Sequence, residues 1–199
     1  MSFRKKTIQV GQTAFNQLRS DRLKAIRNWD KGDVSTFIEF KRTMGTDKKY
    51  QSNSLDKDYS SEELSAEVLE KLKSLIPDED VKAIIVTVPA KFTVNQKDAT
   101  TRAAYLAGFE HCELLQEPIA ASMAYGIDGN AQNGYLLVFD FGGGTFDAAL
   151  LKVEDRIMKV IDTEGDNYLG GKNLDYAIVD DLIIPYLRKK FTIENILKD

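Results

Sequence analysis

The feature that most constrains this chain is the segment Asp140-Phe-Gly-Gly-Gly-Thr-Phe-Asp147, which follows the apolar run Leu136–Phe139. Three consecutive glycines let the backbone turn sharply and approach a ligand closely, so that successive N–H groups can converge on phosphate oxygens. Thr145 adds a hydroxyl, and Asp140 and Asp147 flank the turn, where they could hold a hydrated Mg²⁺ or orient an attacking water. The alternative is a glycine hairpin between two strands that binds nothing, and the flanking carboxylates favour phosphate binding.

Two capping boxes predict where helices begin. Ser60 is followed three residues later by Glu63, and Thr93 by Gln96, so that side chain and backbone can cap each other reciprocally. Apolar residues at helical spacing follow both boxes, and Gly108 is expected to end the second helix. A further helix is expected to begin after Pro118.

Apolar runs of strand length alternate with these helices, which predicts an α/β architecture. Ala83–Val88 is continuous and apolar, as is typical of a parallel strand buried on both faces. Three more strands are expected at Tyr135–Asp140, Phe146–Val153 and Arg156–Asp162. Helical spacing returns over Leu174–Leu187, where Pro185 would kink or shorten the helix.

The first 60 residues are polar, and their apolar residues follow no regular helical or strand spacing over most of this length. We expect a helix over Thr13–Ile26, a short strand over Thr36–Phe40, and a loop or exposed hairpin over Thr46–Tyr59. The polar, glycine-bearing stretch Ile127–Gly134, which follows Gly126 at the end of the Pro118 helix, is the best candidate for a linker.

Composition excludes several classes of function. A net charge of −4 and a pI near 5.2 argue against a nucleic-acid-binding surface. One cysteine and one histidine exclude an intrachain disulfide framework and make a zinc site of these two types improbable.

The adjacent His111 and Cys112 are read as structural, because neighbours in sequence rarely meet side chain to side chain. We find no signal peptide and no run of 18 apolar residues, so the expectation is a cytoplasmic protein without a membrane span.

Four motifs in order resemble the 70-kDa heat-shock chaperones of the DnaK type. The glycine segment resembles their second-lobe phosphate loop, Asp-x-Gly-Gly-Gly-Thr-x-Asp. The others are Val86-Thr-Val-Pro-Ala90, Gln116-Glu-Pro-Ile-Ala-Ala-Ser-Met-Ala-Tyr-Gly126 and Gly165-Asp-Asn-Tyr-Leu-Gly-Gly171, with a weaker match of Lys41-Arg-Thr-Met-Gly45 to the family's Lys-Arg-Leu-Ile-Gly. The resemblance implies an incomplete actin-like (ribonuclease-H-like) ATPase fold, with residues 1–127 in the first lobe and 128–199 opening the second.

The resemblance also implies roles for residues that match the family's motifs. ATP or ADP and Mg²⁺ would be the ligands, with Asp140 near the metal and Glu117 acting on it through water. Lys41 would lie near the transferred phosphate, where a cation offsets developing charge. The residues implied around the metal, γ-phosphate and attacking water are Asp140, Thr145 and Asp147, and the implied backbone contacts to nucleotide come from Gly142, Gly143, Gly144 and Gly171.

The chain also departs from the family pattern. Lys172-Asn173 stands where two acidic residues are usual, Tyr168 replaces a frequent His, and Glu113 stands where an interdomain-signalling Arg often occurs. The family's first phosphate loop, Asp-Leu-Gly-Thr-Thr, finds no match before Gly11, and the adenosine-binding part of the second lobe is not matched.

These gaps lead us to expect negligible ATP hydrolysis by the chain alone and self-association through exposed sheet edges. In the whole protein, unfolded client peptides and co-chaperones would be the partners. Two alternatives stay open: a non-catalytic actin-like adaptor module, and a phosphotransferase of the same superfold.

Overall fold

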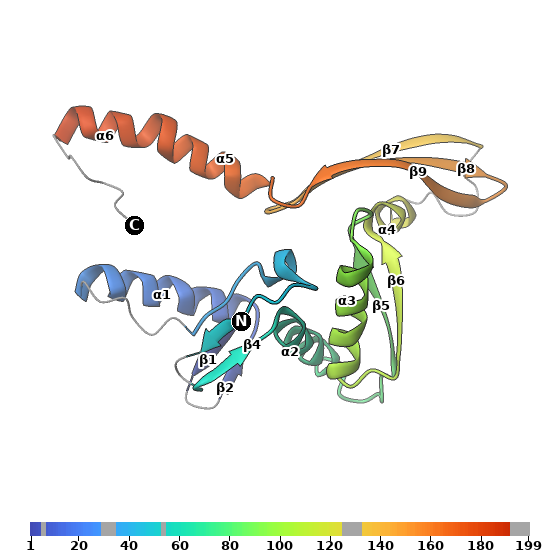
Figure 1. Ribbon diagram of the computed structural model, residues 1–199, viewed down its shortest axis with the longest axis horizontal. Helices are drawn as coiled ribbons and strands as arrows, with labels where there is room; N and C mark the ends of the chain where they lie inside the picture. The colour runs from blue at the N-terminus through green and yellow to red at the C-terminus, as the bar shows by residue number, and fades with distance from the viewer. Residues whose placement is uncertain (5–6, 29–34, 53–54, 125–132, 192–199) are drawn as a thin grey trace. The chain divides into compact units, whose positions relative to one another are not determined.

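The structure is a computed structural model that describes residues 1–4, 7–28, 35–52, 55–124 and 133–191. Helices are interspersed with strands and strand pairs along the chain (Figure 1), which confirms the predicted mixture of α and β elements. The chain divides into two compact units. The first unit comprises Met1–Val88 with Phe92–Glu117, and the second comprises Pro89–Lys91 with Pro118–Asp199.

The first unit contains three helices, one short 3-10 turn and three pairs of strands among its described residues. In chain order these are β1 (Ser2–Arg4), β2 (Thr7–Gln9), α1 (Gln12–Asn28), the 3-10 turn η1 (Phe40–Thr43), β3 (Tyr50–Ser52), β4 (Lys57–Tyr59), α2 (Ser61–Lys73), β5 (Ala83–Val88), α3 (Val94–Leu106) and β6 (His111–Gln116). Strands β1 and β2 pair antiparallel, as do β3 and β4, which confirms a hairpin within 46–59. The hairpin is exposed only in part, because Ser52 and Tyr59 are buried.

Both predicted capping boxes are present. The Ser60 hydroxyl accepts from the Glu63 N–H, and the Glu63 carboxylate accepts from the Ser60 N–H at 2.8 Å. Thr93 and Gln96 make the same exchange at the start of α3. Because each box satisfies orphan donors of its own first turn, local sequence is sufficient to fix where these two helices begin.

An aromatic cluster joins the N-terminal strands to the β3–β4 hairpin. The Phe3 side chain is fully buried, and its ring stacks on Tyr59 with centroids 4.4 Å apart. Leu64 of α2 completes this core, and Phe37 packs against its edge. The cluster therefore anchors the segment that leads into η1.

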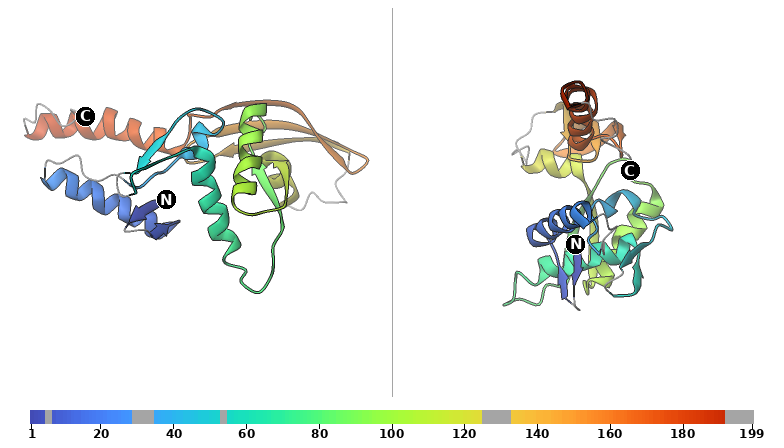
Figure 2. Two further views of the ribbon diagram at one scale, coloured as in Figure 1. Left: turned by 60° about the horizontal axis from the view of Figure 1, so that its bottom comes forward. Right: turned by 90° about the vertical axis from the view of Figure 1, so that its left-hand side faces the viewer.

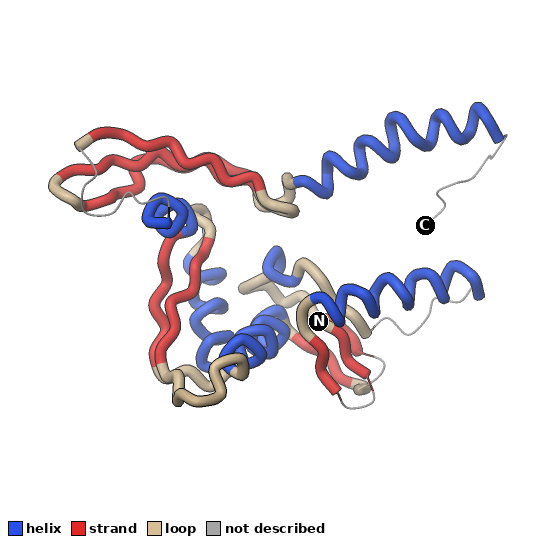
Figure 3. Tube along the Cα trace, turned by 180° about the vertical axis from the view of Figure 1, so that it is seen from behind, coloured by secondary structure: helices blue, strands red, loops and turns tan. Residues whose placement is uncertain are grey.

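Strands β5 and β6 form a parallel pair connected by α3 (Figure 3), with Ala83 opposite His111 and Val88 opposite Gln116. The prediction of a parallel strand is confirmed, but the prediction that both its faces are buried is wrong. Ile84 packs on the core cluster of α2 and α3, whereas Ile85 is 68% exposed. An apolar run indicates that a strand can be buried, but it does not indicate whether one or both faces of the strand are covered by other elements.

The second unit is built from a helix, a three-stranded antiparallel sheet and a long C-terminal helical segment. Its elements are α4 (Glu117–Ala124, whose first residue belongs to the first unit), β7 (Gly134–Phe141), β8 (Phe146–Glu154), β9 (Ile157–Asp166), α5 (Gly171–Ile178), the π-helical turn η2 (Val179–Ile183) and α6 (Ile184–Phe191). Strand β8 lies between β7 and β9. All three strands were expected, although β9 continues four residues past Asp162.

The helical segment after the sheet is not shortened at Pro185. Figure 2 shows α5, η2 and α6 running on as one helix, and Pro185 is the second residue of α6. A proline ring clashes with the carbonyl four residues earlier, here that of Asp181. Asp181 lies in the π-helical turn, whose wider backbone ring accommodates the proline. The π-helical turn therefore lets the helix continue through Pro185, without the kink or early end that the sequence predicted.

Of the two predictions for residues 13–40, the helix is confirmed and the strand is wrong. The helix over 13–26 is confirmed as α1. The strand over Thr36–Phe40 is wrong, because only Thr36 bridges Ser2 and Phe40 already begins η1. Gly126 and most of the proposed linker lie outside the described residues, and Gly134 opens β7. Within the described ranges, the helices include none with the length and apolar character needed to cross a membrane.

Candidate functional site

The glycine segment forms the turn between β7 and β8, and the strand register places its two aspartates together. Asp140 pairs directly with Asp147, and Phe141 with Phe146. Directly opposed residues of an antiparallel pair project to the same face of the sheet. Asp147 is 5% exposed and shares the buried face of β8 with Ala149, whereas Asp140 is exposed. The two carboxylates thus lie side by side at the base of the turn, one buried and one open to solvent.

The turn is held against the beginning of α5. The Gly142 N–H donates to the Thr145 carbonyl at 2.9 Å, which closes the turn. The first amides of α5 then donate to the turn itself, from Gly171 to the Gly142 carbonyl at 2.9 Å and from Lys172 to the Gly143 carbonyl at 3.1 Å. A helix N-terminus that could bind an anion is used here to fix the conformation of a glycine loop.

Two glycines outside the turn make this arrangement possible, and sequence reasoning gave them no role. A Cβ on Gly170 would lie 2.4 Å from the Gly144 nitrogen, and a Cβ on Gly165 would lie 2.4 Å from the Phe146 carbonyl oxygen. Gly165 is also the register partner of Asp147. An isolated glycine inside a strand signals close backbone approach, so that signal was available in the sequence.

The outer side of the turn is open. A Cβ on Gly143 would meet nothing within 4 Å, and the residue is exposed. Thr145 is half-buried beside it. Because the Gly142 N–H is already bonded within the turn, the part of the loop that can receive a ligand is the Gly143 side of the turn together with Thr145 and Asp140. Open backbone beside carboxylates fits a phosphate group bound with a hydrated divalent cation.

Lys41 and Glu117 form a second group, in the first unit. The Lys41 ammonium donates to the Glu117 carboxylate at 2.7 Å, joining η1 to the first residue of α4. The Lys41 side chain is 50% exposed and that of Glu117 is 18% exposed. Lys41 also lies 6.0 Å from the centroid of the Phe92 ring. The structure therefore brings the predicted residues together in two groups, one in each unit.

A charged pair that sequence reasoning missed lies in the second unit. The Lys91 ammonium donates to Glu164 at 2.7 Å, immediately before Gly165 in β9. The hydrogen bond from Lys91 and its positive charge hold the pKa of Glu164 below the ordinary value for a glutamate. Within the second unit, the pair therefore joins the segment Pro89–Lys91 to β9, the strand in which Gly165 pairs with Asp147.

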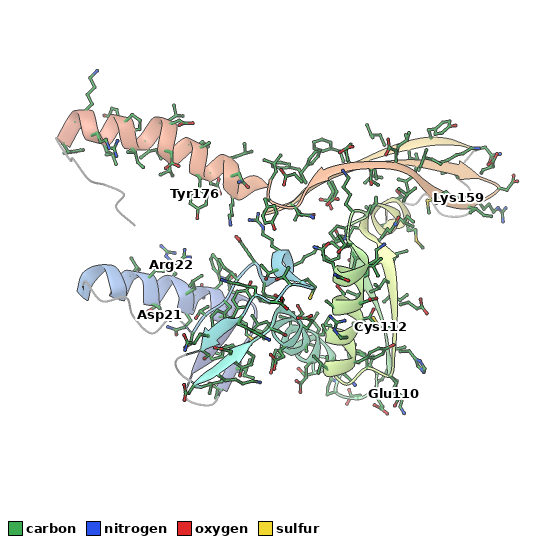
Figure 4. The ribbon with its side chains drawn as sticks, viewed as in Figure 1. Asp21, Arg22, Glu110, Cys112, Lys159 and Tyr176 are labelled. Carbon is green, nitrogen blue, oxygen red and sulfur yellow. The ribbon has the colours of Figure 1, made fainter. Side chains whose placement is uncertain are left out.

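His111 and Cys112 do not form a catalytic pair. They are successive residues of β6, so their side chains project to opposite faces. Cys112 lies on β6 (Figure 4), and burial raises the pKa of its thiol in spite of a hydrogen bond with Thr101. A thiol with a raised pKa carries less of the reactive thiolate at neutral pH.

The comparisons with known proteins agree with the motif order. A family model described as Hsp70 protein matches residues 1–197. The chain belongs to the Hsp70 family. Family membership implies the actin-like ATPase fold, and the mixed helices and sheets are consistent with an incomplete copy of it.

Curated relatives support the same assignment of this Hsp70-family chain. Chaperone protein DnaK of Thermosipho melanesiensis is 40% identical over 176 residues, which cover 87% of this chain and 27% of the relative. The DnaK of Thermosipho africanus is 42% identical over 148 residues (73% and 24%), and that of Thalassiosira pseudonana 44% over 154 (76% and 25%). The chain spans about a quarter of the length of these relatives.

One departure from the Hsp70 pattern has a clear structural role. Asn173 stands where the family usually has an acidic residue, and its side-chain oxygen accepts from the Gly170 N–H at 3.0 Å. The Asn173 N–H in turn donates to the Gly170 carbonyl at 2.8 Å. This exchange caps α5 at the residue that packs on the glycine turn. An amide oxygen therefore performs a capping function here that a carboxylate could also perform.

The family generally binds nucleotide with Mg²⁺, and the turn fits such a ligand. Mg²⁺ keeps several waters and takes one or two carboxylates together with substrate phosphates, rather than a full protein cage. Asp140 and Asp147 provide two carboxylates beside the open turn. No group of three or more His, Cys, Asp or Glu gathers as a metal site within the part of the chain that the structure describes.

Proposed function

We propose that this Hsp70-family chain supplies part of an ATP-binding and ATP-hydrolysing site, in which residues 142–145 receive the phosphates. The observation that carries the proposal is the pairing of Asp140 with Asp147 beneath a glycine turn whose outer side is open. A plain structural hairpin has no use for two carboxylates placed opposite each other, because that arrangement is destabilising without a cation. A phosphate-bound cation gives the pair a function.

The proposed roles follow from chemistry and position. Asp140, which is exposed, would hold Mg²⁺ through its water shell, and Thr145 would donate its hydroxyl to a phosphate oxygen. Asp147 would orient the attacking water from its buried position. When bound, Mg²⁺ would neutralise charge on the phosphates. The turn would contribute backbone from Gly143 and Gly144, while Gly142, whose N–H is bonded to the Thr145 carbonyl, would hold the turn closed.

The Lys41–Glu117 pair would act on the same reaction. An ammonium near the transferred phosphoryl group offsets charge that develops in the transition state. Glu117 orients that ammonium at 2.7 Å and would reach the metal through water. We assign residues 1–127 to the first ATPase lobe and 128–199 to the start of the second, with Gly171 as a further contact to nucleotide.

The whole protein would be a cytoplasmic molecular chaperone whose partners are client peptides and co-chaperones. Phosphoryl transfer depends on positioning and preorganised charge. A chain that corresponds to a quarter of its relatives' length is therefore expected to bind nucleotide weakly and to hydrolyse ATP very slowly by itself. A non-catalytic module of the same fold would also turn over no ATP, but it would not need Mg²⁺ at the turn.

Nucleotide binding by the chain tests the proposal. Fluorescent ADP should bind only in the presence of Mg²⁺, and Asp140→Asn should weaken binding by at least about tenfold, since a charge-assisted contact is lost. Asp58→Asn is the matched control, because Asp58 is an exposed strand aspartate that faces Gln51 rather than a carboxylate. Mg²⁺-independent binding, or equal loss in both variants, would refute the proposed site.

A further inference from the structure

A cluster of three hydroxyl groups lies beneath the turn that carries Lys41. The Thr43 hydroxyl oxygen is 2.6 Å from the Tyr50 hydroxyl and 2.8 Å from the Ser61 hydroxyl. It also lies 3.1 Å from the Phe40 carbonyl oxygen. Three separate elements, η1, β3 and α2, therefore converge on one oxygen atom.

The donors and acceptors of this cluster can be assigned. A threonine hydroxyl has one proton and two lone pairs. Its proton is donated to the Phe40 carbonyl, so Tyr50 and Ser61 donate to the two lone pairs. Thr43 thus uses its full hydrogen-bonding capacity. Ser61 is fully buried, so loss of its acceptor would leave a buried hydroxyl unsatisfied.

The turn that holds Lys41 needs such external support. η1 has four residues, and 3-10 hydrogen bonds have poorer geometry than α-helical ones. Glu39, which precedes the turn, has the left-handed φ of 59°, which is unfavourable for a residue with a side chain. The hydrogen bond from Thr43 to Phe40 joins the last residue of η1 to its first.

The chain immediately after the turn is fixed by a close approach to α3. Gly45 has a φ of 72°, and a Cβ there would lie 2.8 Å from the backbone of Asn95 in α3. Met44 beside it is buried. Lys41 therefore extends from a turn whose C-terminal end is held by the hydroxyl cluster at Thr43 and by the backbone packing at Gly45.

We propose that Thr43 is a positioning residue for Lys41, and that its hydroxyl fixes the orientation in which the Lys41 ammonium meets Glu117. The relevance to ATP hydrolysis rests on the proposed function, whereas the positioning itself does not. Thr43 stands where the similar family segment, Lys-Arg-Leu-Ile-Gly, has leucine, so the hydroxyl cluster is a feature of this chain's own residues.

Side-chain NMR of the lysine ammonium groups in this chain tests the positioning. We expect the Lys41 Nζ order parameter to exceed that of exposed Lys48, and Thr43→Val to lower it to the Lys48 level. Thr43→Ser keeps the hydroxyl and should restore the wild-type value. Thr163→Val, a matched threonine in β9 of the second unit, should leave Lys41 unchanged.

A Thr43→Val chain that remains folded with an unaltered Lys41 order parameter would overturn the proposal, as would failure of Thr43→Ser to restore it. If Thr43→Val does not fold, Tyr50→Phe removes one donor from the cluster and should produce a smaller drop in the same order parameter. An unaltered value in Tyr50→Phe would then overturn it.

A second measurement separates this proposal from the proposed function. Lys41→Gln and Thr43→Val should both reduce the affinity for the Mg²⁺ complex of a non-hydrolysable ATP analogue, which keeps the γ-phosphate, Thr43→Val by up to about tenfold, because misplacing a contact group is costly. If Lys41→Gln leaves the affinity unchanged while Thr43→Val still mobilises Lys41, the proposed role of Lys41 fails and its positioning by Thr43 stands.

Discussion

Asp140 lies directly opposite Asp147 in the pairing of β7 with β8, at the last register position but one before the glycine turn. The two carboxylates differ in environment, because Asp147 is buried and Asp140 is exposed. Like charges placed directly opposite each other in a sheet repel, and a bound cation would relieve that repulsion. Stability and ligand binding should therefore change in opposite directions when one carboxylate is removed.

Asp140→Asn is expected to stabilise the free chain while weakening its binding of Mg²⁺·ADP. Like charges directly opposite in a sheet cost up to about 1 kcal/mol, so the free energy of unfolding should rise by a few tenths to 1 kcal/mol. Urea denaturation without nucleotide measures it. Asp58→Asn, whose register partner is Gln51, should leave stability unchanged. Destabilisation by Asp140→Asn would contradict the opposed-carboxylate explanation.

Gly170 and Gly143 should respond differently to alanine. At Gly170 the new Cβ would lie 2.4 Å from the Gly144 nitrogen, so Gly170→Ala should cost about 1–3 kcal/mol, as overpacking usually does. At Gly143 the new Cβ would meet no atom within 4 Å, so the fold should tolerate Gly143→Ala, but nucleotide affinity should fall because the methyl group occupies the open side of the turn. Equal thermal stability of the two variants would show that α5 does not pack on the turn as described.

The start of α2 should lose stability in acid. Partial burial opposes ionisation of Glu63, but the Ser60 N–H and the Lys57 ammonium outweigh it, and the pKa of Glu63 lies below its ordinary value of 4.5. A lowered folded-state pKa contributes stability that is present above the unfolded value and is lost as the pH falls through the folded one. The free energy of unfolding should thus decline below about pH 4.5.

Glu63→Gln isolates that contribution. Glutamine preserves the capping box but does not titrate, so the variant should show a shallower loss of stability in acid than the wild-type chain. Some loss of stability in acid should remain in this variant because of Glu62, whose pKa is also lowered. Burial opposes the lowering of the Glu62 pKa, but hydrogen bonds, including one from Arg102, outweigh it. Identical pH profiles for the two proteins would exclude Glu63 as a source of acid sensitivity.

Cys112 should react slowly with alkylating reagents. Burial raises the pKa of its thiol, so at mildly alkaline pH iodoacetamide should modify it more slowly in the folded chain than in urea. His111→Ala should not alter the folded rate, since the two side chains project from opposite faces of β6. A rate that falls in the His111 variant would reveal an interaction between them.

Local signals in the sequence predicted most of the helices and the β7–β9 sheet. The Ser60 and Thr93 capping boxes satisfy their own first turns, so no distant residue is needed to place α2 and α3. Strand β6 was missed because His-Cys-Glu-Leu-Leu-Gln has no clear alternation, and its pairing with β5 supplies what the pattern lacks. Strands β1 and β2 have three residues each and depend on the aromatic contact of Phe3 with Tyr59.

The residues of the candidate site were predicted from the sequence, but the contacts that bring them together were not. Asp140, Thr145 and Asp147 were identified from the motif, yet only strand register shows that the aspartates oppose each other. The use of α5 amides to bind the Gly142 and Gly143 carbonyls is a tertiary contact, which no spacing rule contains. The Thr43 cluster joins residues up to 18 positions apart, and it too becomes visible only in three dimensions.

Backbone NMR of the chain during titration with Mg²⁺·ADP tests the central claim most directly, because it reports on each amide of the turn. We expect the largest shift changes at residues 142–145, with Asp140 and Asp147 next, and none of them when Mg²⁺ is omitted. Saturation with nucleotide that leaves 140–147 unshifted, or that shifts another surface instead, would contradict the assignment of this turn as the phosphate site.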